Sequence, residues 1–171
     1  NGSYNRNRLI RLGNETGTQN YDEVLGLGVI SRAENGEPFP FFYGWKTAGI
    51  FQSEEQIAGY VNSNGELLQP DAVPGDVIFT DYNGDGVIDD GDRTKLGKGT
   101  PDWTFGFNVG LEWKGIDFNA FFHAMAGNDI YDASRRYDNS YVNMPSYMLN
   151  RWCGPGTSDR WPRLTSSGGG G

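Results

Sequence analysis

Two neighbouring stretches of alternating residues constrain the fold of this chain more than any other feature. Over residues 103–113 every odd position is apolar, whereas the even positions carry Thr, Gly, Asn, Gly and Glu. Over residues 116–126 the even positions are apolar, and the odd positions carry Asp, Asn, Phe, His and Met. A period of two places alternate side chains on one face, so each stretch is predicted to be a β-strand with one apolar face.

The two residues between these stretches, Lys114 and Gly115, form a two-residue turn in which Gly supplies the positive φ that such turns need. A turn of this length fixes which residues oppose one another. The predicted pairs are Trp113 with Ile116, Leu111 with Phe118, Val109 with Ala120, and Phe107 with Phe122. Directly opposed residues share a face, so every apolar residue meets another and the two strands form one hairpin.

The pattern alone leaves two partners open for the apolar face of the hairpin. It would be buried in the core of a soluble β-sandwich, or it would face lipid. Eleven residues at about 3.3 Å each, tilted by about 45°, span roughly 25 Å, the height of the apolar band of a membrane β-barrel. Trp103 and Trp113 at the strand ends resemble the aromatic girdles of such barrels.

The composition favours an all-β protein and disfavours two functional classes. The chain of 171 residues contains 26 glycines and 14% aromatic residues, which indicates β-structure with many turns. Its formal net charge of −8 argues against binding to nucleic-acid phosphates. His123 is the only histidine and has no nearby nucleophile or acid in a catalytic arrangement, so we expect no enzyme activity. Cys153 is the only cysteine and is expected to be free and buried.

The stretch "DYNGDGVIDDGD" (residues 81–92) holds five aspartates and no Lys or Arg. It matches the calcium-loop pattern D-x-[DN]-x-[DN]-G, with Gly86 at the sixth position where the chain must turn sharply. Six residues fall at ligand positions: Asp81, Asn83, Asp85, Val87 through its carbonyl, Asp89 and Asp92. Oxygen donors at this spacing suit Ca²⁺, with Mg²⁺ as a second possibility, and a bound cation would offset the repulsion between the carboxylates. The alternative, which is less favoured, is a solvated acidic loop of Asx turns that holds no metal.

Two features of this loop indicate a structural staple and not a calcium switch. Asp92 closes the loop where an EF-hand has a bidentate Glu, as in dockerin-type loops. The preceding segment "GDVIFTD" reads as a short strand, whereas an EF-hand has a helix there. We expect an affinity typical of extracellular modules, with a dissociation constant on the order of 10⁻⁴–10⁻³ M.

The remaining segments are less regular. "SEEQIAGYV" begins with an N-cap Ser and predicts one or two turns of helix. Residues 38–52 are rich in aromatic residues and broken by Pro and Gly, so they predict a packed loop or short strands. Stacking on a sugar and packing within loops are both open to eight aromatic residues, and packing is favoured: Phe41, Phe42, Tyr43, Trp45, Tyr131, Tyr137, Tyr141 and Tyr147.

Three ordered motifs together resemble one family. "GEPFPFFYGWKTAGIFQSEEQI" is followed by the acidic loop and hairpin, and then by "LNRWCGPGTSDRWPRLT". This order resembles the SusC/RagA-type TonB-dependent outer-membrane transporters of Bacteroidetes, over roughly residues 1–166. Cys153 departs from the family string, which is similar to "RWTGPGTS", and the terminal "GGGG" is not explained by the family.

The resemblance implies that this chain is a C-terminal piece of a transmembrane antiparallel β-barrel, which has 22 strands and large extracellular loops in the family. It implies four regions. They are the end of a barrel strand (residues 1–9), a large extracellular loop holding the acidic loop (10–101), a transmembrane hairpin (102–126), and the next extracellular loop with a flexible tail (127–171).

The function implied by the resemblance is nutrient import. The whole protein would take up oligosaccharides or peptides across the cell outer membrane, with its loops on the cell surface. Its partners would be a SusD-like surface lipoprotein acting as a lid, TonB acting through the N-terminal region, and outer-membrane lipid. The alternative is a soluble extracellular β binding module stapled by calcium. A dockerin is disfavoured because only one calcium-type loop is present.

Overall fold

The computed structural model describes residues 1–24, 28–132 and 145–164. The chain divides into two compact units, one made of Asn1–Tyr43 and Lys95–Arg136, the other of Gly44–Thr94 and Tyr137–Gly171. Taken over all the described residues, strands are more common than helices, and they form sheets of three, four and two strands. The all-β prediction is confirmed, and no closed barrel is formed by the described residues.

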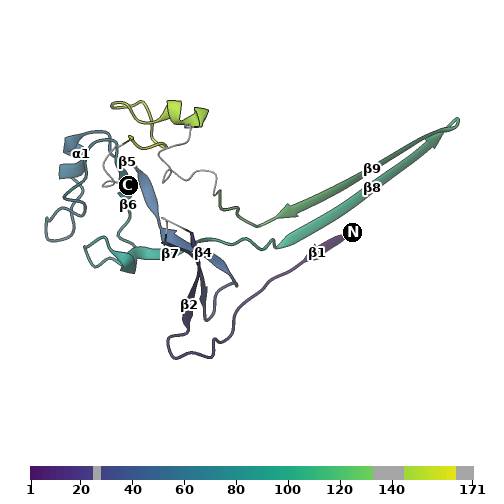
Figure 1. Cartoon of the computed structure of the whole chain (residues 1–171), viewed down its shortest axis with the longest axis horizontal. Helices are drawn as coiled ribbons and strands as arrows, with labels where there is room; N and C mark the ends of the chain where they lie inside the picture. Colours follow the sequence, from purple (N-terminus) through teal and green to yellow (C-terminus); the bar gives the residue numbers. More distant parts are fainter. Residues whose placement is uncertain (25–27, 133–144, 165–171) are drawn as a thin grey trace. The chain divides into compact units, whose positions relative to one another are not determined.

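The long hairpin of the first unit has the predicted strands and register. Strand β8 (Trp103–Trp113) pairs antiparallel with β9 (Ile116–Ala126), and Trp113 faces Ile116 while Phe107 faces Phe122 (Figure 1). The turn residues Lys114 and Gly115 both have positive φ, 49° and 81°. Two positive φ values are the signature of a type I′ turn, whose twist matches the twist of the strands.

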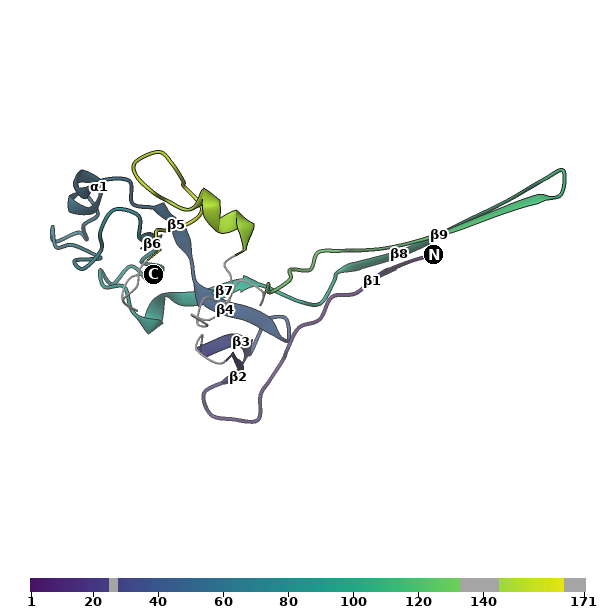
Figure 2. The same cartoon turned by 45° about the horizontal axis from the view of Figure 1, so that its top comes forward.

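A third strand is added to the hairpin at the β8 edge. Strand β1 (Gly2–Tyr4) pairs antiparallel with β8, placing Gly2 opposite Phe105 and Tyr4 opposite Trp103 (Figure 2). The rings of Tyr4 and Trp103 lie 4.5 Å apart. The sheet order is β1-β8-β9, so β9 has no further strand partner among the described residues.

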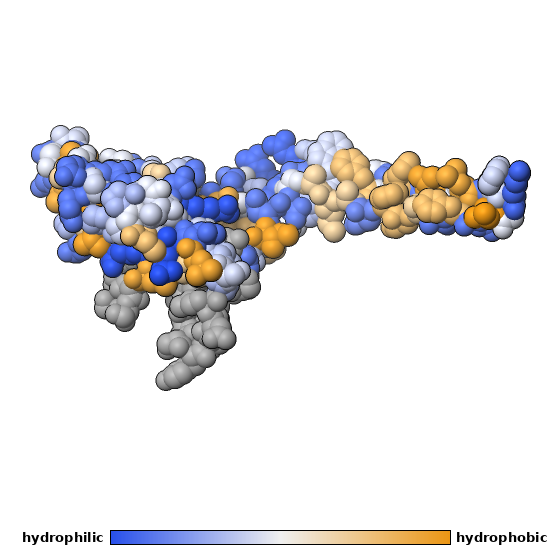
Figure 3. Space-filling view, turned by 90° about the horizontal axis from the view of Figure 1, so that it is seen from above, coloured by the Kyte–Doolittle hydropathy of each residue, from blue (hydrophilic) through white to orange (hydrophobic). Residues whose placement is uncertain are grey.

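Apolar side chains remain exposed along the hairpin. The space-filling view shows them gathered along one side of its length (Figure 3). Phe107, Leu111 and Trp113 are 62%, 62% and 66% exposed, and all three belong to the alternating apolar set. An apolar face of this size on a protein surface indicates a membrane or a partner that covers it.

A four-stranded sheet of order β2-β3-β4-β7 was only partly anticipated. It comprises β2 (Thr18–Val24), β3 (Gly28–Glu34), β4 (Phe41–Trp45) and β7 (Arg93–Gly97). Of these, only β4 falls in a segment for which short strands were predicted. Ala33 and Phe41 are buried, and the register places them on opposite faces of the sheet. The guanidinium of Arg32 lies 4.6 Å from the ring centre of Tyr43.

The second unit is built around a small apolar core. Strands β5 (Thr47–Ile50) and β6 (Val77–Phe79) pair, and helix α1 (Glu54–Ala58) packs Ile57 against Phe51 and Ile78. The side chain of Ser53 accepts a hydrogen bond from the Gln56 N–H, so the predicted N-cap and short helix are confirmed. No helix of the described residues has the length and apolar character needed to cross a membrane.

Gln52 links this core to the loop at residues 152–158. Its side-chain Nε2 donates to the Ser158 carbonyl, and its Oε1 accepts from Trp152 Nε1 and from the Gly156 N–H, at 3.0, 3.2 and 2.8 Å. Arg163 Nε donates to the buried carboxylate of Asp76 at 2.6 Å. These contacts join segments that lie about a hundred residues apart in the sequence.

Two further short helices are present: η1 (Asp90–Asp92) and η3 (Ser146–Asn150), both of the 3₁₀ type. The prediction that Cys153 is buried is wrong, because its thiol is exposed. The chain turns back at this point through a hydrogen bond from the Cys153 N–H to Thr157 Oγ1 at 2.8 Å, within a loop whose residues 155–157 are exposed as well. The predicted flexible tail, residues 165–171, lies outside the described residues.

Candidate metal centre and adjoining cavity

The acidic loop follows β6 and is ordered by hydrogen bonds from its own backbone. Asp81 begins the loop: its Oδ1 accepts from the Gly84 N–H at 2.6 Å and its Oδ2 accepts from the Gly86 N–H at 2.9 Å. Gly84 and Gly86 have φ values of 78° and 86°, in the left-handed region that a side chain disfavours. The Gly at position six therefore serves the sharp turn that the sequence pattern predicts.

The next two candidate ligands contact one another. Asn83 Nδ2 donates to Asp85 Oδ2 at 2.8 Å, while the Asp85 N–H donates to Asn83 Oδ1 at the same distance. Asp85 Oδ1 accepts from the Val87 N–H at 2.9 Å. The outer half of the loop is thus a series of side-chain to backbone turns built from the residues at positions one, three and five.

Asp92 closes the loop from the inside. It is fully buried, and its Oδ1 accepts from the N–H groups of Tyr82 and Asn83 at 2.8 and 3.3 Å. Its Oδ2 accepts from the Asp89 N–H at 2.9 Å, and Asp89 in turn caps η1. Burial raises the pKa of Asp92, but the hydrogen bonds that its carboxylate accepts from these three N–H groups outweigh burial and lower the pKa overall.

The oxygen donors of the loop fit a hard cation. In this structure its carboxylates accept hydrogen bonds from the loop backbone. The six predicted ligand residues lie within one closed turn of chain and offer oxygen atoms only, as Ca²⁺ prefers. However, no group of three or more His, Cys, Asp or Glu side chains in the described part of the chain converges at a spacing that could hold a metal ion. Binding would require these side chains to move toward one another. It would not require the backbone bonds to break, because each carboxylate oxygen of Asp81 and Asp85 that accepts an N–H keeps a second lone pair for the cation.

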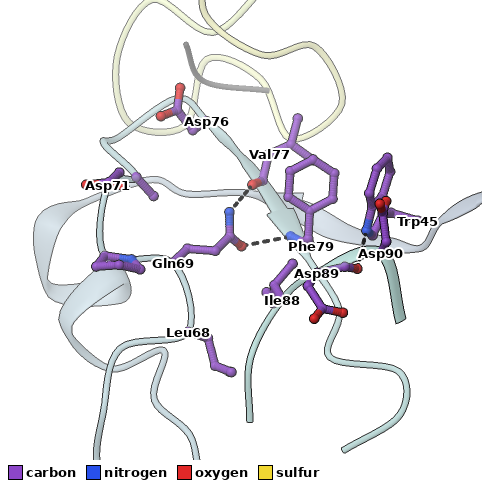
Figure 4. A pocket seen from close by; sticks show the side chains of 12 residues that line it. Trp45, Leu68, Gln69, Asp71, Asp76, Val77, Phe79, Ile88, Asp89 and Asp90 are labelled. Carbon is purple, nitrogen blue, oxygen red and sulfur yellow. Dashed lines mark hydrogen bonds between the residues drawn. The ribbon is translucent and has the colours of Figure 1, made fainter. Parts of the chain in front are cut away.

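A cavity of about 680 Å³ adjoins the loop within the second unit (Figure 4). The loop contributes Ile88, Asp89 and Asp90 to its lining, and residues 68–72 contribute another part. Gln69 holds this wall against β6, because its Nε2 donates to the Val77 carbonyl at 3.1 Å and its Oε1 accepts from the Phe79 N–H at 2.9 Å. The polar atoms of Gln69 are therefore used within the wall.

Trp45 connects the cavity to the acidic loop, and the sequence did not predict this role. Its indole Nε1 donates to the Asp89 carbonyl at 2.8 Å. One face of the ring lies under the guanidinium of Arg93 at 4.6 Å, and the ring of Phe79 stands edge-on at 6.2 Å. No spacing in the sequence could reveal this contact, because Trp45 and Asp89 are 44 residues apart.

Five of the aromatic residues for which packing was favoured have packing contacts. Phe41 is buried, Tyr43 contacts Arg32, Trp45 pairs with Phe79, and Phe42 pairs with Tyr131 at 6.3 Å. In the C-terminal loop, Tyr147 stacks on Trp161 at 4.8 Å. The other two candidates, Tyr137 and Tyr141, lie outside the described residues.

Comparison with known proteins gives a consistent result. No family model matches the sequence. TonB-dependent receptor P26 of Formosa agariphila is 33% identical over 167 residues, which is 94% of this chain. TonB-dependent receptors P3 and P39 of the same organism are 33% and 30% identical and cover 75% and 96% of the chain. The chain is related by sequence to TonB-dependent receptors.

The chain spans 12–18% of the length of the TonB-dependent receptors it matches. The family resemblance predicted from the motifs is confirmed as a relationship to TonB-dependent receptors, which are transporters of the outer membrane. The all-β fold and the exposed apolar hairpin agree with that class.

Proposed function

We propose that this chain is part of a TonB-dependent importer of the SusC/RagA type, in which the β8–β9 hairpin crosses the outer membrane. The observation that carries the proposal is the division of the hairpin into two faces. One face exposes Phe107, Leu111 and Trp113. The other carries Thr, Gly, Asn and Glu on β8 and is mixed on β9, where Phe121 and Met125 lie among Asp, Asn and His. An apolar outer face and a polar inner face are what a barrel strand needs between lipid and an aqueous lumen.

The turn at Lys114 and Gly115 sets the proposed orientation. Outer-membrane barrels have short turns on the periplasmic side and long loops on the outside. The two-residue turn would therefore be periplasmic, and the acidic loop and cavity would lie on the cell surface. Strand β9 has no second partner among the described residues, and this supports a continuing barrel, because an unpaired strand edge in lipid leaves backbone groups without partners.

We further propose that the acidic loop binds Ca²⁺, or Mg²⁺ in its place, as a structural staple. Asp81, Asn83, Asp85, the Val87 carbonyl, Asp89 and Asp92 would hold the ion. The ion would neutralise carboxylates that now lie close together and would fix a long loop whose own apolar core is small. Asp92 would continue to anchor the loop backbone from inside.

The substrate and partners of the whole protein are proposed from the family resemblance. They are an oligosaccharide or a peptide as substrate, a SusD-like lipoprotein as the lid, and TonB as the source of energy. The same resemblance suggests a Bacteroidetes source. This proposal contains no catalytic step, and the acidic residues are assigned to metal binding and loop structure.

The test begins with the native membrane. Membranes carrying this sequence are solubilised in mild detergent, and the intact mass and co-purifying chains of the purified protein are recorded. A chain of about 100 kDa, as expected from the 12–18% coverage of the relatives, with a lipoprotein partner supports the importer. A water-soluble species near 18.9 kDa would instead support the calcium-stapled soluble module, with the apolar face covered by protein.

A further inference from the structure

We propose that the cavity beside the acidic loop binds a cationic side chain, the ammonium of a lysine or the guanidinium of an arginine presented by a peptide. The inference goes beyond import, since it needs only the second unit and a ligand that reaches it. The cavity offers an apolar wall for the aliphatic stem of such a side chain and carboxylates for its charged end. The same carboxylates would repel an anionic ligand.

Charge is the first argument. Among the described residues that line the cavity, four are aspartates and none is Lys, Arg or His. Asp76 is already neutralised, because Arg163 Nε and Nη2 donate to its two oxygens at 2.6 and 3.4 Å. Asp89 is partly used as well, since its Oδ1 accepts from the Gly91 N–H.

Two carboxylates therefore remain for a ligand. Asp71 makes no ion pair with the described residues. Asp90 lies 3.7 Å from Arg93 Nη1 and is 84% exposed, so this contact is a weak surface pair that an incoming cation can replace. Neither residue is among the six predicted metal ligands, so the proposed cation site and the metal loop can be altered separately.

The aromatic wall is the second argument. Trp45 and Phe79 line the cavity, and their rings meet edge to face at 6.2 Å. Trp45 is held in place through its bond to the Asp89 carbonyl and through Arg93 on one face of its ring. Arg93 occupies one face of the indole, so a second cation would gain its interaction from the rest of the aromatic pair and against the like charge of Arg93.

Apolar surface gives the cavity its selectivity for a long side chain over a bare metal ion. Leu68, Pro70 and Ile88 line it together with the aromatic pair (Figure 4). Lysine and arginine bury their methylene stems along such surfaces while the charged end reaches polar atoms. A volume of about 680 Å³ leaves room for the side chain and for part of the peptide that carries it.

The test measures binding of a fluorescent trilysine peptide, blocked at both ends, to the detergent-solubilised protein that contains this chain. Fluorescence anisotropy at low ionic strength gives the dissociation constant, because salt would screen the attraction. The comparison probe is the same peptide with its three ammonium groups acetylated. We expect the acetylated probe to bind at least about tenfold more weakly.

The variant is Asp71→Asn combined with Asp90→Asn, which should raise the dissociation constant of trilysine about tenfold. The matched control is Glu15→Gln with Glu54→Gln, which removes the same charge at exposed positions outside the cavity and should change binding less than about twofold. Equal loss in both variants, equal binding of the acetylated probe, displacement by maltotriose, or no binding below about 10 mM would each overturn the proposal.

The same variant distinguishes two sources of the cationic side chain. If it belongs to a transported peptide, Asp71→Asn with Asp90→Asn lowers cellular uptake of trilysine and leaves the co-purifying chains unchanged. If it belongs to a partner protein, the variant weakens co-purification of that chain and leaves uptake unchanged. Both results require the binding loss measured above.

Discussion

Replacing Asp92 with Ala removes the one buried carboxylate of the acidic loop. Three backbone N–H groups, those of Tyr82, Asn83 and Asp89, lose their acceptor. A hydrogen bond to a charged group contributes about 1.5–3 kcal/mol, but Tyr82, Asn83 and Asp89 are exposed, so water replaces part of the loss. With two short bonds and one of 3.3 Å, we expect the local free energy of opening to fall by about 3 kcal/mol.

Hydrogen exchange followed by mass spectrometry measures this change directly on peptides covering residues 80–92. A loss of about 3 kcal/mol corresponds to exchange faster on the order of a hundredfold. The experiment is run in a chelator, so that only the hydrogen bonds contribute. Asp90→Ala is the matched control, because it removes the same charge at a position two residues from Asp92. The Asp90 carboxylate is 84% exposed and makes only a weak pair with Arg93.

Equal acceleration in Asp92→Ala and Asp90→Ala would refute the reasoning, since charge relief alone would then explain both. Adding Ca²⁺ extends the test to the proposed metal. Calcium should slow exchange across residues 80–92 in the unmodified protein, and the effect should be much smaller in Asp92→Ala. If about 10 mM Ca²⁺ leaves exchange unchanged in the unmodified protein, the staple proposal is contradicted, whereas the hydrogen-bond account stands.

Three further predictions follow from the same structure. Phe107→Arg should destabilise the membrane-inserted protein by about 2–4 kcal/mol, whereas Asn108→Arg on the opposite face should be tolerated; urea unfolding in lipid vesicles separates them, and equal effects would contradict a lipid-facing apolar side. Hydrogen bonding lowers the pKa of Asp92 below its usual 3.8. The loop amides should therefore be protected from hydrogen exchange above pH 3.8 and should lose this protection as the pH falls through the lowered pKa. Arg163→Gln leaves the carboxylate of Asp76 buried without its cation and should cost about 2–3 kcal/mol, less than a fully buried pair, seen as faster proteolysis of the C-terminal loop; an unchanged cleavage rate would mean the pair is not holding that loop.

The hairpin was the most predictable part of the fold, because its information is local. A period of two, a two-residue turn and complementary faces determine the register without knowledge of any other segment, and Trp113–Ile116 through Phe107–Phe122 pair as predicted. The capped helix after Ser53 and the strand at β6 were predictable for the same reason.

The pairing of β1 with β8 and the hairpin of β2 with β3 could not be predicted in the same way. The first joins residues about a hundred positions apart, and no turn length fixes its register. The second has few apolar residues at alternating positions, since "TQNYDEV" and "GVISRAE" are mostly polar. Strand pairing there depends on tertiary context that a short window does not contain.

The acidic loop shows which structural features a sequence motif can predict and which it cannot. Its pattern correctly predicted a sharp turn at Gly86 and a closing role for Asp92. It did not predict that the carboxylates would be occupied by the backbone of the loop itself, nor that Trp45 would bind the Asp89 carbonyl. The cavity is a product of segments brought together by folding, so its residues have no common signal in the sequence.

The bonds of Gln52 have a consequence for the order of events during biosynthesis. The chain is synthesised from its N-terminus. Gln52 is therefore made well before its partners Trp152, Gly156 and Ser158, which follow the whole β8–β9 hairpin in the sequence. Contacts over so long a stretch carry a large closure entropy and form slowly. The second unit is therefore completed only after the hairpin has been made, which leaves the loop carrying the cavity and the acidic turn open to solvent and chaperones until then.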